Sequence, residues 1–281
     1  MKIAAIYCVY NEEEYIEYSI RSIYDFVDHV FVLLGCAPYC AYNARAREQF
    51  QQPDQTETIV RRLAATHPKI QLITGLWDSE QAHRNAGMRL CLGHGDDYYF
   101  LVDGDEVYRR DHLEQLRTEV AAHPEAGQFI IKCHLFWRSF RYRIPAEELG
   151  WMPRRVFKVT WISRLGKSWL PLPRPCWFTG NNKTNSWGTV YHIPPERVVF
   201  YHFSYARSPA RMQEKLLTFS HAHEILDGWY TRVWLPWPQQ RHMTAIHPID
   251  PPKFSRAVYH EVSDLPEVMR SHPYFEQDVI G

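Results

Sequence analysis

The chain has 281 residues, 45% of them hydrophobic, which is enough for one large domain or two small ones with a real core. Lysine plus arginine and aspartate plus glutamate number 32 each, so overall charge implies no polyanionic partner. The N-terminus runs into an apolar strand without a secretory pattern, and no apolar run approaches the roughly 18 residues of a membrane span. Six scattered cysteines fit neither a disulfide framework nor a zinc site. These features predict a cytoplasmic protein with reduced thiols.

Strand and helix patterns alternate over residues 3–102. Apolar runs and helical periodicity predict, in chain order, a strand at 3–9, a helix at 13–24, a strand at 30–34, a helix at 56–66, a strand at 70–74, a helix at 79–92 and a strand at 98–102. Such alternation is typical of βαβ units and a parallel sheet. Ligands of such sheets bind beyond the carboxyl ends of the strands. We therefore expect the polar groups at 11–13, 77–78 and 103–106 to line one crevice.

The rest of the chain is less regular. A connector at residues 35–55 is long enough to be a functional lid, or else a surface insertion without function. Later patterns predict a helix at 111–122, a strand at 129–133, an irregular stretch at 135–187, a strand at 198–205 and a helix at 209–226. No repeat and no flexible linker separates these parts. One compact unit is therefore expected, with residues 1–110 and 111–281 as its two halves.

Three carboxylates follow the last of the buried strands, in the sequence Asp103-Gly104-Asp105-Glu106. Clustered carboxylates repel one another unless a cation or a set of hydrogen-bond donors compensates them. Mg²⁺ and Mn²⁺ prefer oxygen ligands and often share their shell between carboxylates and substrate phosphates. The cluster therefore predicts a metal and phosphate site, with a solvent-facing acidic turn as the alternative.

Together with two other motifs, this cluster resembles family 2 glycosyltransferases of the GT-A fold, most closely a bacterial subgroup. The motifs are Val9-Tyr10-Asn11-Glu12-Glu13, Trp77-Asp78 with Ala82-His83-Arg84-Asn85, and Asp103-Gly104-Asp105-Glu106. The resemblance covers residues 1–110. It implies an α/β fold of GT-A type, a Rossmann-like, mostly parallel sheet flanked by helices, with an irregular acceptor-side C-terminal half. Residues 1–110 would bind the nucleotide sugar and residues 111–281 the acceptor.

The resemblance also implies an activity and a set of site residues. The activity is a metal-dependent transfer of a sugar from a nucleotide-diphosphate donor, with UDP expected, to an acceptor hydroxyl, using Mn²⁺ or Mg²⁺. The residues implied to bind the nucleotide sugar are Val9, Tyr10, Asn11, Glu12, Asp78, Arg84, Asn85, Asp103 and Gly104. Asp105 would ligate the metal, and His202 would complete its shell, with His192 as the rival. Asp78 and Arg84 have alternative interpretations as a helix cap and a surface ion pair.

The sequence departs from the family pattern at the nucleobase and at the general base. Leu34-Gly35-Cys36 stands where the family commonly has a base-binding Asp, and Asp54-Gln55-Thr56 follows only after the long connector. Uridine is therefore less well supported than the rest. No Asp or Glu occurs from residue 150 to 195, where inverting members carry their base. The remaining candidates for the base are Glu106, Glu147, Glu148 and Glu196, and a retaining mechanism, which needs no such base, stays open.

The acid-free stretch is also basic and aromatic. Between residues 132 and 187 there are eleven Lys or Arg against two Glu, interleaved with Trp, Phe and Tyr. This pattern favours an anionic, phosphate-bearing acceptor, contacted by Trp151, Arg154 and Arg155. The alternatives are a hydroxylated base in a nucleic acid, or arginines that pair with acids elsewhere while the aromatic rings fill the core.

Two rival functions have less support. A nucleotidyltransferase would usually show a Gly-rich, basic phosphate loop after the first strand, whereas the loop here is the acidic Asn11-Glu12-Glu13-Glu14. A binding module that kept the fold and lost its chemistry is supported only by the missing base.

Overall fold

The computed structural model describes residues 1–39, 53–150, 153–165, 168–180, 183–185, 188–219 and 221–281, and only the backbone of residues 161–174. Most of the predicted connector, residues 40–52, lies outside this part, as does Trp151. Within it, no helix is both long and apolar enough to cross a membrane. The five described cysteines are free thiols.

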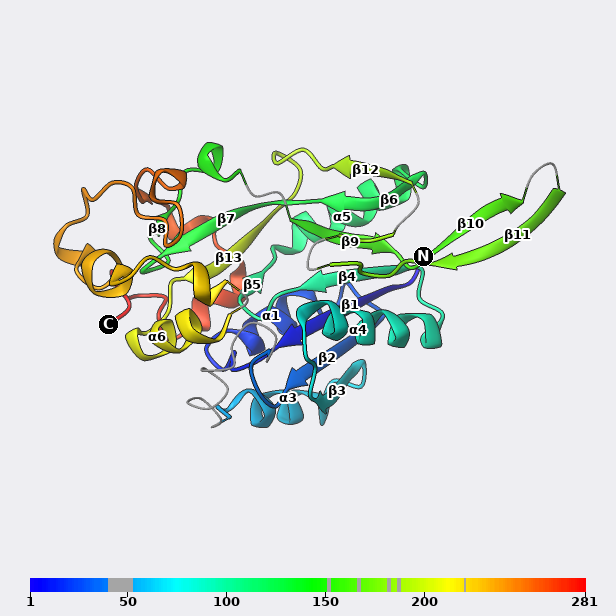
Figure 1. The fold of residues 1–281 in the computed structure, drawn as a ribbon, viewed down its shortest axis with the longest axis horizontal. Coiled ribbons are helices and arrows are strands. Elements are labelled where there is room, and N and C mark those ends of the chain that lie inside the picture. The colour runs from blue at the N-terminus through cyan, green and yellow to red at the C-terminus, as the bar shows by residue number, and fades with distance from the viewer. Residues whose placement is uncertain (40–52, 151–152, 166–167, 181–182, 186–187, 220) are drawn as a thin grey trace.

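The predicted alternation of strands and helices is confirmed in the first half of the chain (Figure 1). Its elements are β1 (Ile3–Val9), α1 (Ile16–Ile23), β2 (His29–Gly35), α3 (Thr56–Ala64), β3 (Ile70–Gly75), α4 (Glu80–His94) and β4 (Tyr98–Val102). Helix α4 is capped at both ends: the Ser79 hydroxyl accepts a hydrogen bond from the Ala82 N–H at 3.2 Å, and Gly95 ends the helix with a φ of 68°.

The central sheet has the strand order β12-β6-β9-β4-β1-β2-β3, and β1 lies parallel to both β2 and β4. The chain runs outward from β1 through β2 to β3 and then returns to place β4 on the other side of β1. This reversal of strand order leaves a crevice at the carboxyl ends of β1 and β4, the usual ligand position in open α/β sheets.

Helices cover both faces of this sheet. Helices α1, α3 and α5 (Arg110–Ala122) contribute to the larger hydrophobic core on one face, and α4 packs on the other face through Met88 and Cys91. The helices are amphipathic and the strands β1, β2 and β4 are almost wholly buried, as apolar runs of this kind indicate.

A second, five-stranded sheet has the order β14-β8-β7-β13-β5. The remaining strands are β5 (Glu106–Val107), β6 (Ala126–Ile130), β7 (Lys132–Trp137), β8 (Tyr142–Arg143), β9 (Arg154–Lys158), β12 (Thr189–His192), β13 (Val199–Tyr205) and β14 (Val258–Tyr259). The prediction of one strand at 129–133 is wrong, because the chain passes from the first sheet to the second at Ile131. The ribbon β10 (Thr160–Leu165) and β11 (Ser168–Pro175) projects from the body of the molecule (Figure 1).

The C-terminal part consists of one α-helix, α6 (Pro209–Thr218), followed mainly by short turns of helix. Ser208 caps α6, as the Ser-Pro start predicts, but the predicted end at 226 is wrong, because extended backbone at Phe219 ends the helix earlier. The π-helical turn η3 (Tyr230–Trp234) lies over the end of the second sheet.

Candidate active site

The acid cluster lies where β4 passes into β5, so one turn connects the two sheets. The Glu106 N–H donates to the Asp103 carbonyl at 3.0 Å and closes this turn. A Cβ at Gly104 would lie 2.8 Å from Cγ of Glu12, so only glycine lets this turn approach the loop after β1.

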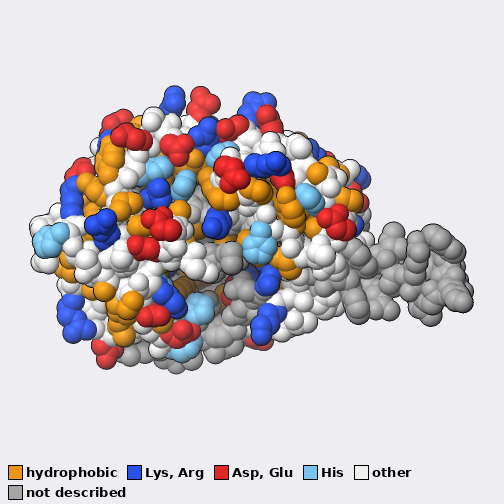
Figure 2. Space-filling model, turned by 90° about the horizontal axis from the view of Figure 1, so that it is seen from above, with side chains coloured by type: hydrophobic (Ala, Val, Ile, Leu, Met, Phe, Trp, Pro, Cys, Tyr) orange, Lys and Arg blue, Asp and Glu red, His pale blue; other side chains and the backbone are white. Residues whose placement is uncertain are grey.

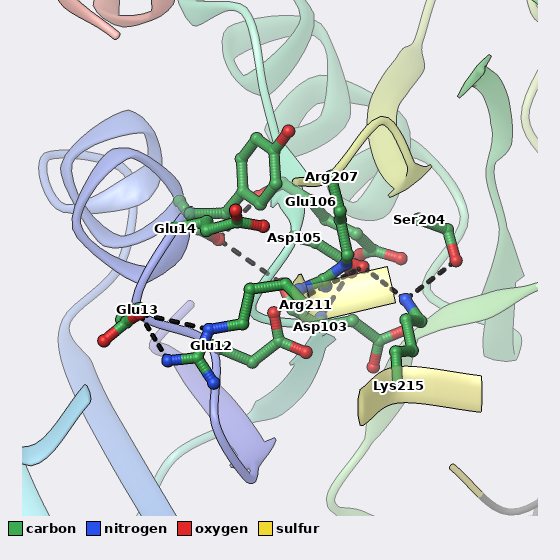
Figure 3. Close-up of polar contacts among 12 residues, drawn as sticks. Glu12, Glu13, Glu14, Asp103, Asp105, Glu106, Ser204, Arg207, Arg211 and Lys215 are labelled. Carbon is green, nitrogen blue, oxygen red and sulfur yellow. Dashed lines mark hydrogen bonds and ion pairs between the residues drawn. The ribbon is translucent and has the colours of Figure 1, made fainter. Parts of the chain in front are cut away.

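Asp105 is buried and surrounded by cations (Figure 3). One carboxylate oxygen accepts from Arg207 at 2.6 Å and from Lys215 at 2.8 Å, and the other lies 3.1 Å from Nε2 of His202. Burial opposes ionisation, but Lys215, His202 and Arg207 together hold the pKa of Asp105 well below its usual range. Asp105 is therefore an anion at neutral pH.

Asp103 and Glu106 share the guanidinium of Arg155, which β9 delivers from the neighbouring strand position. Arg155 donates to Asp103 at 2.8 Å and forms an ion pair with Glu106, which also accepts from the Tyr108 hydroxyl at 3.1 Å. The Asp103 side chain is 36% exposed, whereas that of Glu106 is 0% exposed. Burial would raise the pKa of Asp103, but Arg155 holds it below its usual value; burial raises the pKa of Glu106 well above its usual value, although Arg155 opposes this.

A carboxylate and histidine group of this site fits a divalent ion in donor type. One ligand atom from each of Asp103, Glu106 and His202 lies within 4.8 Å of the other two. Carboxylate oxygen and imidazole nitrogen suit Mn²⁺, and the carboxylates suit Mg²⁺. Asp105, the predicted ligand, lies beside His202 but already binds two side-chain cations. An ion that used Asp105 would share that carboxylate with Lys215 or displace it.

A cleft opens beside these acids at the ends of β1 and β2, and helix α6 forms its second wall. It is lined by Cys8, Val9, Tyr10, Asn11, Glu12, Gly35, Ala37, Pro38, Tyr39, Trp77, His83, Arg207, Arg211, Glu214, Lys215, Thr218 and Phe219. Of the groups predicted to converge, at 11–13, 77–78 and 103–106, the cleft lining contains Asn11, Glu12 and Trp77, whereas residues 103–106 are not part of it. Burial raises the pKa of Glu12 to about 7, opposed by Arg207, from which Glu12 accepts a hydrogen bond at 2.6 Å.

The loop after β1 is tied to two other segments. Asn11 has a φ of 50°, and its side-chain amide donates to Glu214 of α6. The Glu12 N–H donates to the Thr56 hydroxyl at 2.8 Å, and the Glu13 N–H donates to Asp54 at 3.0 Å. The Asp54-Gln55-Thr56 motif therefore contacts the loop after β1 that lines the cleft, although more than forty residues separate the two in the chain.

The aromatic side chains of Tyr39, Trp77 and His83 also line the cleft. The His83 ring stacks on Trp77 with a centroid distance of 3.9 Å, and its Nδ1 lies 2.9 Å from the Tyr39 hydroxyl. His83 Nε2 donates to the Leu33 carbonyl, and burial lowers the pKa of His83 to about 3, so the imidazole is neutral. Its Nδ1 is then the acceptor for Tyr39.

The other predicted residues lie outside the cleft lining. Asn85 of α4 donates to and accepts from the backbone of Phe178 at 2.9 and 2.8 Å, and Arg84 forms an ion pair with Glu80. Asp78 is exposed just before α4, and Arg155 is buried and paired with Asp103 and Glu106. His202 is brought to the cluster because β13 pairs with β5; its rival His192 is exposed on β12, at the edge of the central sheet. Arg154 opens β9, half-buried.

The sequence analysis missed the basic residues of α6. Arg211 pairs with Glu13, and Lys215 also donates to the Ser204 hydroxyl at 2.9 Å (Figure 3). Arg211 and Lys215 are four residues apart, which places both on one face of α6, and Arg207 lies just before the Ser208 cap of this helix. This spacing could have predicted a basic helix face from the sequence.

The family model of glycosyl transferase family 2 matches residues 5–167, more than half of the chain. The chain belongs to glycosyl transferase family 2. It is accordingly a glycosyltransferase, and its fold is the GT-A type that the sequence predicts. No curated protein sequence matched it.

Solved structures with a similar arrangement include S. aureus TarS, at 16% identity and a TM-score of 0.42, covering 81% of this chain and 40% of TarS. TarS 1–349 in complex with UDP is 14% identical with a TM-score of 0.45, covering 85% of this chain and 78% of that one. A mannosyltransferase from Pyrobaculum calidifontis, in complex with GDP-Man and Mn²⁺, is 23% identical with a TM-score of 0.38, covering 56% of this chain and 44% of that one. This chain thus spans less than half the length of two of these three proteins.

Proposed function

We propose that this glycosyltransferase moves a sugar from a nucleotide-diphosphate donor, with UDP as the nucleotide, to a hydroxyl of an anionic or phosphate-bearing acceptor, in a reaction that depends on Mn²⁺ or Mg²⁺. The observation that carries the proposal is the meeting of an acid cluster and a basic helix face at the ligand-binding end of β1 and β4. Acids alone would repel a diphosphate. Here Arg207 and Lys215 lie against Asp105 and supply the compensating charge.

The basic, acidic and aromatic side chains in and beside the cleft would have different roles in this reaction. Arg211 and Lys215 line the cleft and attract the diphosphate, and they stabilise it as it gains charge while the glycosidic bond breaks. A divalent ion held by Asp103 and His202, with or without Asp105, would supply a further positive charge to the leaving group, and Glu106 would stay outside its shell. Tyr39 and Trp77 line the cleft together with His83, so aromatic surface borders the space in which a nucleobase would lie.

The proposed general base is Glu106, as the sequence suggested. Because its side chain is fully buried against Arg155 and Tyr108, an acceptor hydroxyl would have to reach it from the Asp103 side, directly or through one water. A pKa raised by burial suits a carboxylate that takes up a proton near neutral pH.

The test is an assay of nucleotide-sugar hydrolysis and transfer with a panel of donors, with and without Mn²⁺ or Mg²⁺. We expect metal-dependent turnover of a UDP-sugar by the wild type, and a loss of about 100-fold or more in Asp105→Asn, which keeps the size of the side chain but removes its charge. Asp25→Asn, at an exposed position after α1, is the matched control and should behave as wild type. Donor binding without turnover on any acceptor would favour a binding module, and full metal-dependent activity in Asp105→Asn would contradict the assignment of Asp105.

A further inference from the structure

Arg138 is a buried arginine without a carboxylate partner among the described residues. Its side chain is 3% exposed, and its Nε and Nη1 have no hydrogen-bond partner. The other buried arginines, Arg84, Arg155 and Arg207, each form an ion pair with a carboxylate. Burial lowers the pKa of Arg138 to about 10, a value at which the group still carries its charge at pH 7. An unpaired buried charge is costly, so its presence calls for an explanation.

Two further rare features occur at the same contact. Arg138 has a φ of 60°, a strained conformation for a residue with a side chain, and its backbone is fixed there by bonds to Tyr205 and Ile280. Its guanidinium carbon lies 3.7 Å from the ring centroid of Trp234, which belongs to the π-helical turn η3. Strained residues and π-helical turns are concentrated at functional sites. Their coincidence with an unpaired guanidinium indicates a ligand site rather than a packing accident.

The position of Arg138 relates it to the cleft. The Trp234 indole donates to the Tyr205 carbonyl at 3.2 Å, and the Tyr230 hydroxyl lies 3.5 Å from the carbonyl of Pro209, the first residue of α6. The same Tyr205 carbonyl accepts from the Arg138 N–H at 2.9 Å, so Arg138 and η3 meet at the end of β13. Arg138 therefore lies at the end of the strand that carries His202 to the acid cluster.

We propose that Arg138, stacked on Trp234, binds an oxyanion, a phosphate or carboxylate group of the acceptor. The stacking occupies one face of the guanidinium, and the N–H groups at its edge, of which those at Nε and Nη1 are buried without a partner, are the donors for an anion, which a guanidinium recognises through two parallel hydrogen bonds. The indole N–H groups of Trp137 and Trp237, in the same aromatic cluster, are likewise buried without acceptors, so this region is rich in donors and poor in acceptors. The oxyanion site stands on these contacts, and only its assignment to the acceptor rests on the proposed function.

The test is thermal unfolding of the full chain titrated with inorganic phosphate or glycerol phosphate, with chloride as the ionic-strength control. We expect phosphate near saturation to raise the Tm of the wild type by about 2–4 °C or more. Arg138→Met should lose this rise and, because it removes an unpaired buried charge, should unfold at the same temperature as the anion-free wild type or higher. Lys215→Met, which removes a cation from the donor cleft, is the control for phosphate bound there and should keep the rise.

The outcomes separate the proposal from its alternatives. A phosphate shift that disappears in Lys215→Met but persists in Arg138→Met would overturn the site, as would an anion-free Arg138→Met that is strongly destabilised, since that result assigns Arg138 a structural role. Arg138→Lys, which keeps the charge, should bind phosphate more weakly than the wild type; binding equal to Arg138→Met would count against the site. Binding of inorganic phosphate without glycerol phosphate overturns the assignment to the acceptor. Hydrolysis of the nucleotide sugar by the wild type reports on the proposed function separately.

Discussion

Asp105 and Glu106 are neighbours in the chain but lie in opposite electrostatic surroundings. Asp105 contacts two full cations and an imidazole, which keep it ionised, whereas Glu106 is enclosed by protein, and burial raises its pKa and thus its affinity for a proton, although Arg155 opposes this. The turn presents the Asp105 carboxylate to Lys215 of α6 and the Glu106 carboxylate to Arg155 of β9. The two acids therefore suit different tasks, a fixed anion in one case and a proton acceptor in the other.

Replacement of Glu106 by Gln tests the second task. Because Gln has the shape of protonated Glu, and its amide oxygen can still accept from Arg155 while its NH2 group donates to the Tyr108 oxygen, we expect nucleotide-sugar binding within about 3-fold of wild type and transfer reduced by about 100-fold or more. Binding is measured by calorimetry and transfer by product formation. Glu267→Gln, on an exposed side chain, is the control and should be unaffected. Unchanged transfer in Glu106→Gln would move the base elsewhere, and loss of transfer in Glu148→Gln instead would identify its replacement.

Helix α6 is the element that completes the cleft, although it follows the acid cluster by about a hundred residues. Its basic face binds the acids of two other elements: Lys215 contacts Asp105 after β4, and Arg211 contacts Glu13 after β1. In the absence of a ligand these ion pairs hold the helix against the sheet. A metal ion that used Asp105, as we propose, would therefore compete with Lys215 for that carboxylate.

This competition predicts a change of affinity with a defined sign. Lys215→Met should bind Mn²⁺ more tightly than wild type, by about 3- to 10-fold, because one cation next to Asp105 is removed. The same variant should bind the nucleotide diphosphate more weakly, since it lacks a donor to the phosphates. Mn²⁺ binding is measured by EPR titration and the nucleotide by calorimetry in the presence of Mn²⁺. Lys132→Met, at an exposed position of β7, should change neither. Weaker Mn²⁺ binding in Lys215→Met would contradict competition at Asp105.

Two glycines of helix α4 predict opposite effects of the same substitution. Replacing glycine by alanine inside a helix gains up to about 1 kcal/mol of helix propensity. At Gly87, however, the new Cβ would lie 2.5 Å from Cγ2 of Ile6 in β1, and overpacking of a buried contact costs about 1–3 kcal/mol. Gly87→Ala should therefore lower the free energy of unfolding and Gly93→Ala, which has open space around it, should leave it unchanged or raise it. Urea unfolding of both variants measures this; equal effects would show that the Ile6 contact relaxes freely.

Features of the fold that depend on neighbouring residues could be predicted from the sequence, and those that depend on contacts between distant segments could not. Continuous apolar runs predicted β1, β2 and β4, because a strand buried on both faces is apolar at every position. They therefore also predicted that the acids after β4 lie at a strand end. The end of α6 was overestimated, since nothing in its sequence marks the extended backbone at Phe219. The pairing of Lys215 with Asp105 depends on how distant elements pack, and a single sequence carries no record of that packing.

At the scale of the molecule, the two sheets are joined through the acid cluster. The division of the chain between these sheets brings His202 to the acids, and it also explains why the strand predicted at 129–133 is two strands. His202 reaches Asp105 only because β13 pairs antiparallel with β5, the two-residue strand after the acids. The change of sheet at Ile131 comes at the end of the apolar run 129–131, and the alternation that begins at Lys132 belongs to β7, which the prediction of one strand at 129–133 did not separate from β6. The face in Figure 2 shows basic and acidic side chains intermixed, as equal numbers of both lead one to expect, so selectivity for an anionic acceptor has to come from enclosed groups.

The whole molecule should lose stability in mild acid, because several histidines are buried in the neutral form. Burial lowers the pKa to about 3 for His83 and to about 4 for His134, His247, His260 and His272. Between these values and the ordinary pKa near 6.5, the unfolded chain binds protons that the folded chain does not, so stability falls as pH decreases. Acids with a raised pKa, such as Glu12 and Glu106, act in the opposite direction but are fewer in this range.

We therefore expect the free energy of unfolding to be roughly 2–4 kcal/mol lower at pH 5 than at pH 7, after this partial offset. Urea midpoints at pH 7, 6 and 5 measure the slope. His260→Asn removes one buried imidazole and should reduce that slope by about 1 kcal/mol per pH unit at most, whatever it does to the stability at pH 7. A midpoint that is independent of pH over this range would contradict the prediction, because folded and unfolded chains would then bind equal numbers of protons.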